Sequence, residues 1–153
     1  FRLQRPEGLL LWFHALSVGE SLALLTLLKR LGELYPSAHF LLTTNIKTSV
    51  EALTSVGLPE RVIHSYLPAD ARGPVQRFLN HWKPNILAIT ETDLWLYMIT
   101  QASRRGIPLV LINGRVANTS FRGRMKTRNI YYIYFTNVSA DTRAGQSRCR
   151  PLD

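Results

Sequence analysis

Two glutamates follow apolar segments at positions where an acidic side chain could do chemistry. Glu20 comes shortly after the apolar run 9–14, and Glu91 directly follows the run 86–90. A carboxylate pair can bind a metal ion or share acid–base work. Because no histidine stands nearby at ligand spacing, the sequence favours acid–base chemistry or substrate orientation, and we expect neither a metal site nor a cofactor.

A helix-capping role is the structural alternative for Glu20. Ser17 and Glu20 have the Ser-x-x-Glu spacing of a capping box, in which each side chain accepts a hydrogen bond from the other residue's amide. Spacing alone favours capping over catalysis. The helix dipole would keep this carboxylate ionised, and an ionised carboxylate in a crevice can still act as a general base. Gly19, which has no side chain, either lets a substrate approach the backbone or serves the turn.

Glu91 would end a buried strand, where a long acidic side chain is unusual, and both a functional and a structural role remain open for it. Asp93 is better explained as a residue of a first helical turn. The four histidines are expected to be structural: His14, His39, His64 and His81. Of these, His14 could also reach a crevice from the first strand.

Positive charge is concentrated in the last third of the chain. Residues 1–100 hold nine Lys/Arg and eight Asp/Glu, a net charge of +1, whereas residues 101–153 hold ten against two, a net charge of +8. Such a region attracts phosphorylated substrates, anionic lipid head groups or nucleic acid, or is a solvated basic face. Guanidinium groups such as those of Arg115 and Arg122 match phosphate oxygens in pairs. No phosphate-binding glycine loop of the P-loop or dinucleotide type is present.

Length and composition predict one folded domain. The 153 residues are 46% hydrophobic and 19% charged, enough apolar material for a sizeable core. The single cysteine, Cys149, excludes an intrachain disulfide and a cysteine metal cluster. No apolar run approaches the roughly 20 residues that span a bilayer. The chain begins with Phe1 instead of Met, so we expect a fragment, with an upstream membrane anchor left open.

Apolar runs and amphipathic segments alternate along the chain, which predicts a parallel sheet with helices on both faces. The expected strands are 9–14, 38–43, 62–67, 86–90 and 108–113, and the expected helices are 17–34, 48–56, 70–82 with Asp70 as its cap, and 94–105. The pattern weakens after Arg115, where we expect a loop leading into a helix and a short strand at 137–140. This gives a Rossmann-like domain over 1–140 and a tail or linker over 141–153.

The expected topology brings the two glutamates together. Ligands of such sheets bind outside the carboxyl ends of the strands, where the strand order reverses. In the common order 3-2-1-4-5, strands one and four are neighbours at that point. The segments that follow them carry Glu20 and Glu91, so both side chains are expected in one crevice.

Several motifs resemble those of one enzyme family. Residues 12–20 read Trp-Phe-His-Ala-Leu-Ser-Val-Gly-Glu and resemble the W-x-H-A-x-S-V-G-E signature of the 3-deoxy-D-manno-octulosonic acid (Kdo) transferases. The likeness continues in the segments 42–44, 66–70, 77–79, 81–84, 91–95, 105–109, 113–115 and 120–122, and it covers nearly all of the chain to about residue 140.

The resemblance implies the amino-terminal, acceptor-side half of a GT-B glycosyltransferase, which has two Rossmann-like domains facing a cleft. Such enzymes transfer Kdo from CMP-Kdo to a lipid A precursor in lipopolysaccharide biosynthesis, without a metal in the transfer step and with inversion of the anomeric centre. They work at the cytoplasmic face of the Gram-negative inner membrane. By the same resemblance Glu20 is the general base and Glu91 a second acidic residue of the catalytic site. Further residues bind substrate: Ser17, Gly19, Asn113, Arg115, Ser120 and Arg122.

Some features depart from the family pattern. Leu96 follows Trp95 where the family usually has proline, and Gly114 stands where alanine is usual. The resemblance also leads us to expect that the carboxy-terminal donor domain is absent and that this chain alone is inactive. The rival hypotheses are a non-catalytic basic module for nucleic acid or anionic lipid, of which nucleic acid is the less favoured partner, and an inactive truncated relic.

Overall fold

The computed structural model describes residues 3–90 and 95–112. In these residues strands and helices alternate strictly. The strands are β1 (Leu10–His14), β2 (His39–Thr44), β3 (Val62–Tyr66), β4 (Ile86–Thr90) and β5 (Leu109–Ile112). The helices are α1 (Val18–Leu34), α2 (Lys47–Val56), α3 (Arg72–Trp82) and α4 (Leu96–Arg104).

The strands form one parallel sheet in the order β3-β2-β1-β4-β5. The α/β Rossmann-like fold and the strand order expected from the sequence are both confirmed. β1 pairs with β2 on one side and β4 on the other, with His14 opposite Thr43 and Ile89. Since the chain runs outward from β1 in one direction and then from β4 in the other, the carboxyl ends of β1 and β4 mark the point where strand order reverses.

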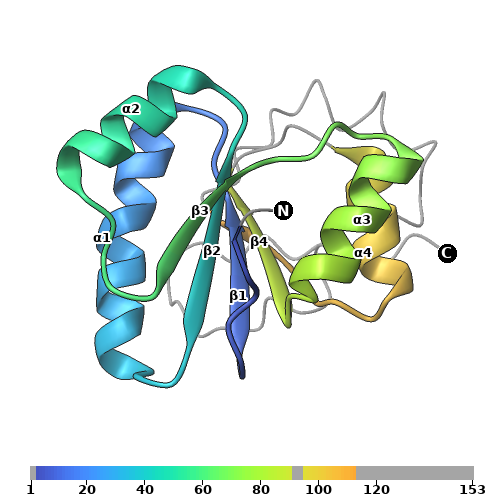
Figure 1. The fold of residues 1–153 in the computed structure, drawn as a ribbon, viewed down its shortest axis with the longest axis horizontal. Coiled ribbons are helices and arrows are strands. Elements are labelled where there is room, and N and C mark those ends of the chain that lie inside the picture. The colour runs from blue at the N-terminus through green and yellow to red at the C-terminus, as the bar shows by residue number, and fades with distance from the viewer. Residues whose placement is uncertain (1–2, 91–94, 113–153) are drawn as a thin grey trace, which may run out of the picture.

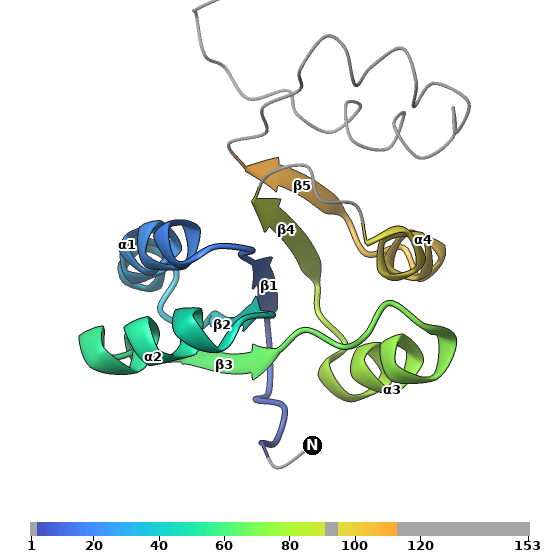
Figure 2. The same cartoon turned by 90° about the horizontal axis from the view of Figure 1, so that it is seen from above.

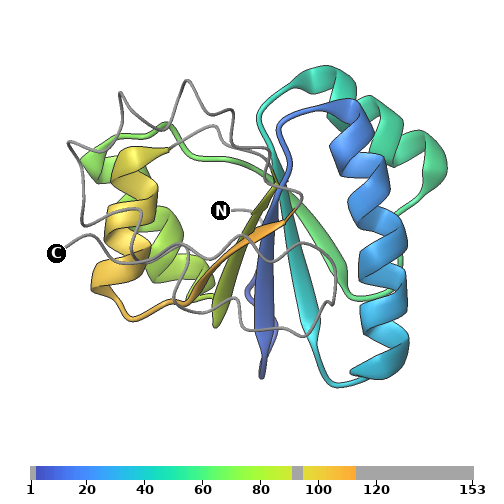
Figure 3. The same ribbon diagram turned by 180° about the vertical axis from the view of Figure 1, so that it is seen from behind.

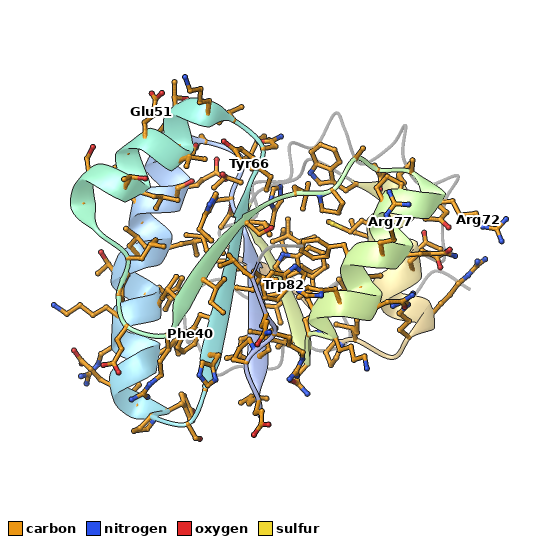
Figure 4. All side chains as sticks on the ribbon, viewed as in Figure 1. Phe40, Glu51, Tyr66, Arg72, Arg77 and Trp82 are labelled. Carbon is orange, nitrogen blue, oxygen red and sulfur yellow. The ribbon has the colours of Figure 1, made fainter. Side chains whose placement is uncertain are left out.

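Two helices cover each face of the sheet. Figures 1 and 2 show α1 and α2 against one face and α3 and α4 against the other, and Figure 3 shows the same three layers from behind. Each face has its own apolar core. Figure 4 labels a member of each, Phe40 on the α1 side and Trp82 on the α3 side, while Arg72 points away from the molecule.

Alternation along β1 explains how both faces are filled. Leu10 and Trp12 belong to the core under α3 and α4, and Phe13 belongs to the core under α1 and α2. Successive side chains of a strand point to opposite faces, so a strand buried on both faces must be apolar at nearly every position. This is why the continuous apolar runs of the sequence predicted the strands to within about two residues.

Asp70 does not cap α3, contrary to the expectation from the sequence. The residue at the start of that helix is Ala71, and no side-chain hydrogen bond caps it. The Asp70 carboxylate instead accepts hydrogen bonds from the amides of Tyr97 (3.1 Å) and Met98 (2.7 Å) in the first turn of α4. A carboxylate is favoured at either helix start, and sequence spacing could not show that the tertiary fold brings Asp70 to the more distant one.

Candidate functional site at the carboxyl edge of the sheet

The turn from β1 into α1 positions Glu20. Ser17 has an extended backbone, and its side chain accepts a hydrogen bond from the Glu20 amide (3.3 Å). The Ser17 carbonyl accepts the first helical bond, from the Ser21 amide (3.0 Å). The predicted N-cap is therefore confirmed, and it places Glu20 in the first turn of α1, directly above the end of β1.

The Glu20 carboxylate is held by donors from three positions. Ser17 Oγ donates to Oε1 at 2.6 Å, and the Leu16 amide donates to Oε2 at 2.9 Å. Thr90 Oγ1 lies 2.6 Å from the same Oε2. The carboxylate thus folds back over the turn as in a capping box, with backbone hydrogen bonds from Ser17 and from Leu16, one residue before the cap.

These contacts favour the ionised carboxylate. Burial alone would raise the pKa of the Glu20 carboxyl. Hydrogen bonds from the hydroxyls of Ser17 and Thr90 and from the backbone of Leu16 and Ser17 outweigh burial, so that the pKa lies below its ordinary value of 4.5. All of the lowering causes are hydrogen bonds. Glu20 is therefore an anion at neutral pH.

Thr90 is the residue of this site that the sequence analysis missed. It is the last residue of β4 and is 6% exposed. Its hydroxyl reaches both Glu20 Oε2 and, at 3.0 Å, the carbonyl oxygen of His14 at the end of β1. The expected adjacency of strands one and four could have pointed to Thr90, because the last residue of one strand then faces the turn after the other.

Gly19 stands beside Glu20 at an exposed position. A Cβ placed on it would meet no atom within 4 Å, and its backbone does not have the positive φ that favours glycine. The turn therefore does not require glycine here, which removes one of the two readings of Gly19. A side chain there would point into open space.

Three of the four histidines have hydrogen-bond partners, whereas the buried Nδ1 of His39 has none among the described residues. His14 is 1% exposed, and its Nδ1 lies 3.0 Å from the carbonyl oxygen of Thr43 on β2. His64 Nε2 lies 2.9 Å from Thr44 Oγ1, and burial lowers the pKa of His64. His81 Nε2 lies 2.8 Å from the carbonyl oxygen of Leu3.

Several predicted site residues lie outside the described residues: Glu91, Asn113, Arg115, Ser120 and Arg122. Of the pair expected in one crevice, the structure places Glu20 against the residue that precedes Glu91. Within 3–90 and 95–112 no group of three or more His, Cys, Asp or Glu side chains could hold a metal ion.

A cavity of about 620 Å³ lies elsewhere, between the second half of α1 and the turn from α2 to β3. Its lining includes Leu28, Gly32 and Arg61 but none of the residues around Glu20. Ligands of doubly wound sheets bind at the carboxyl edge where strand order reverses, so topology and hydrogen bonding identify the Glu20 region as the candidate site. No helix in the described ranges is long and apolar enough to cross a bilayer.

Comparison with known proteins gives consistent matches. The family model described as 3-deoxy-D-manno-octulosonic-acid transferase (kdotransferase) matches residues 1–150. A probable mitochondrial 3-deoxy-D-manno-octulosonic acid transferase of Arabidopsis thaliana is 39% identical over 118 residues, 77% of this chain and 26% of that protein. Proteins named as the same transferase match from Rickettsia felis (35% identity, 85% of this chain and 28% of that protein) and Haemophilus influenzae (35%, 75% and 26%). The chain thus spans about a quarter of the length of these relatives.

Proposed function

The chain belongs to the Kdo transferase family, and we propose that it forms the acceptor-binding half of a GT-B glycosyltransferase with Glu20 as the general base. The whole enzyme would transfer Kdo from CMP-Kdo to a lipid A precursor. The observation that carries the proposal is the hydrogen-bonded, ionised Glu20 carboxylate at the carboxyl edge of the sheet, beside the exposed Gly19.

In the proposed reaction the Glu20 carboxylate takes the proton of an acceptor sugar hydroxyl while the oxygen attacks the anomeric carbon of Kdo. The bond from that carbon to the CMP phosphate oxygen breaks, and CMP leaves with its electron pair. Glu20 ends the step protonated and releases the proton to water. A low pKa keeps the carboxylate ionised before the step, and the attacking hydroxyl becomes more acidic as its oxygen bonds to the anomeric carbon. Base catalysis of this kind contributes roughly 10²–10⁴-fold.

Other roles in the proposal come from the family resemblance. Glu91 would orient the acceptor or Glu20, and Arg115 and Arg122 would hold acceptor phosphates. Ser17 and Gly19 would complete the acceptor site with Asn113 and Ser120. The proposed place of work is the cytoplasmic face of the Gram-negative inner membrane, where the lipid acceptor is embedded.

The decisive experiment replaces Glu20 by glutamine in the whole gene product that contains this chain. Glutamine keeps an acceptor oxygen for the bonds from Leu16 and Thr90 but cannot take a proton. We expect Kdo transfer to fall by about 10²-fold or more. Thermal unfolding of the same variant reports how much of the capping role survives the substitution.

Glu33 provides a matched control, because it is an exposed glutamate later in the same helix whose partner is Arg30. Glu33→Gln should leave transfer unchanged. Near-normal transfer by the Glu20→Gln protein would mean that Glu20 is only a cap. Undiminished binding of the lipid acceptor without any transfer by the unmodified gene product would favour the non-catalytic module or the truncated relic.

A further inference from the structure

The end of β4 supplies Glu20 with a donor from a different part of the chain. Thr90 lies 70 residues beyond Glu20, yet its hydroxyl makes the 2.6 Å contact with Oε2. The other described donors to this carboxylate, the Ser17 hydroxyl and the backbone of Leu16 and Ser17, belong to the turn that Glu20 itself caps. Thr90 is therefore the contact that ties the carboxylate to the sheet and not merely to its own helix.

Chemistry limits what the Thr90 hydroxyl can do at one time. It has one proton but lies near two oxygens that only accept, Glu20 Oε2 at 2.6 Å and the His14 carbonyl at 3.0 Å. An ionised acceptor makes the shorter and stronger bond. The Thr90 hydroxyl therefore donates its hydrogen bond to the carboxylate while Glu20 is charged. A protonated Glu20 loses that advantage, and rotation of the hydroxyl then lets it donate its hydrogen bond to the backbone carbonyl of His14.

We propose that Thr90 is a positioning residue for Glu20, a two-position donor that holds the carboxylate while it is ionised and turns to the His14 carbonyl once the carboxyl carries a proton. The hydroxyl is buried, so an unmade hydrogen bond there would be costly. The second acceptor removes that cost after proton transfer. The role rests on the proposed function only in so far as Glu20 is the base.

The surroundings of the carboxylate make the effect of Thr90 measurable. The described groups that bond to it come from the β1–α1 turn and from β4, and none of them carries a charge. His14, the titratable residue of β1, directs Nδ1 to Thr43. Removing the Thr90 hydroxyl should therefore change the pKa of Glu20 through a lost hydrogen bond and not through a changed charge.

The first test titrates the Glu20 carboxyl by carbon-13 NMR in the 153-residue chain, and needs no transferase activity. Thr90→Val and Thr90→Ala both remove the hydroxyl and should raise the pKa of Glu20, whereas Thr90→Ser should keep it close to that of the unmodified chain. Thr44→Val is the matched control: Thr44 is also a buried threonine at the end of a strand, but its hydroxyl pairs with His64. This variant should leave the Glu20 titration unchanged.

The second test measures kinetics in the whole gene product. Loss of one hydrogen bond to a charged group predicts a fall in kcat of about tenfold for Thr90→Val, with a small change in KM for the acceptor. The acidic limb of the pH–rate profile should move to higher pH, and Thr90→Ser should restore most of the rate. A residue that merely packs the strand end would lower stability without moving that limb.

The proposal is overturned if Thr90→Val and Thr90→Ala leave the Glu20 pKa where Thr44→Val leaves it, or if Thr90→Ser behaves like Thr90→Val. Failure of the proposed function has a different signature: the Glu20→Gln protein would still transfer Kdo. The carbon-13 titration would in that case still decide whether Thr90 holds the carboxylate.

Discussion

At the scale of single residues, Gly19 is a position where a requirement of function can be told apart from a requirement of folding. Gly19 lies in the first turn of α1, its φ is not positive, and a Cβ there would meet nothing within 4 Å. Nothing in the described fold requires glycine at this position. Alanine is the better helix former, so selection for stability alone would not favour glycine.

We therefore predict that Gly19→Ala raises stability slightly, by up to about 0.5–1 kcal/mol, and weakens binding of the acceptor. Calorimetric unfolding and acceptor titration would measure the two effects. Gly32→Ala is the control, since Gly32 lies in the same helix and its added Cβ would make an ordinary 3.7 Å contact with Phe40. It should not weaken acceptor binding. Equal acceptor binding by both variants would show that the open space at Gly19 is not used.

The hydrogen bonds to Glu20 also predict a pH-dependent stability. The pKa of the folded carboxyl lies below the ordinary 4.5 because of the Ser17 and Thr90 hydroxyls and the backbone amides, which outweigh burial. A lowered pKa means that folding is stabilised by the ionised form. This contribution is fully present above about pH 4.5 to 5 and is lost as the pH falls through the folded pKa.

Chemical denaturation of the unmodified chain and of Glu20→Gln at several pH values would measure this contribution. The difference in unfolding free energy between them should be constant near neutrality and should shrink in acid. A difference that does not change with pH would show that the Glu20 charge contributes nothing to stability.

At the scale of elements, Asp70 connects two helices on the same face of the sheet. It precedes α3, yet its carboxylate accepts hydrogen bonds from the amides of Tyr97 and Met98 at the start of α4. The first amides of a helix have no partner within the helix, so this side chain fills the role of a cap from outside. It fixes the start of α4 relative to the loop that leads out of β3.

We predict that Asp70→Ala destabilises the protein by about 1 kcal/mol, the usual cost of a lost cap. Asp70→Asn, which keeps one good acceptor, should lose less. Hydrogen exchange would locate the effect: the amides of Tyr97 and Met98 should exchange faster, and the first turn of α3 should not change. Faster exchange at the start of α3 instead would mean that Asp70 acts on that helix after all.

The elements that the sequence predicted well are those fixed by burial. A strand covered on both faces must be apolar throughout, and a helix packed on it carries an apolar stripe. For this reason β1, β4 and α1 could be predicted from the sequence. The cap at Ser17 was also visible because both partners lie in one turn. Contacts that depend on the tertiary fold could not be predicted in this way. Asp70 and Thr90 are the examples, since each bonds to a residue at least 27 positions away.

At the scale of the whole molecule, the uneven charge is the feature that must be explained. The net charge of residues 1–100 is +1 and that of residues 101–153 is +8. If the chain takes a phosphorylated lipid acceptor, particular arginines should matter. If it were a basic module for nucleic acid, each lost charge should weaken binding by a similar step and with a steep dependence on salt.

The corresponding prediction compares five arginines that all lie outside the described residues. Arg115 and Arg122 come after β5 in the sequence, and we expect them to contact acceptor phosphate. Arg143, Arg148 and Arg150 are expected to be general surface charge. Charged hydrogen bonds to phosphate are worth about 1.5–3 kcal/mol each when shielded from water, and exposed charges far less. Arg115→Ala or Arg122→Ala should therefore weaken binding of a bisphosphorylated lipid A precursor more than binding of its dephosphorylated form, while Arg148→Ala changes little.

The five single variants would be titrated against both lipids and an oligonucleotide at two salt concentrations. Equal, salt-steep losses across all five, with no preference for the phosphorylated lipid, would contradict an acceptor site and favour the nucleic-acid module.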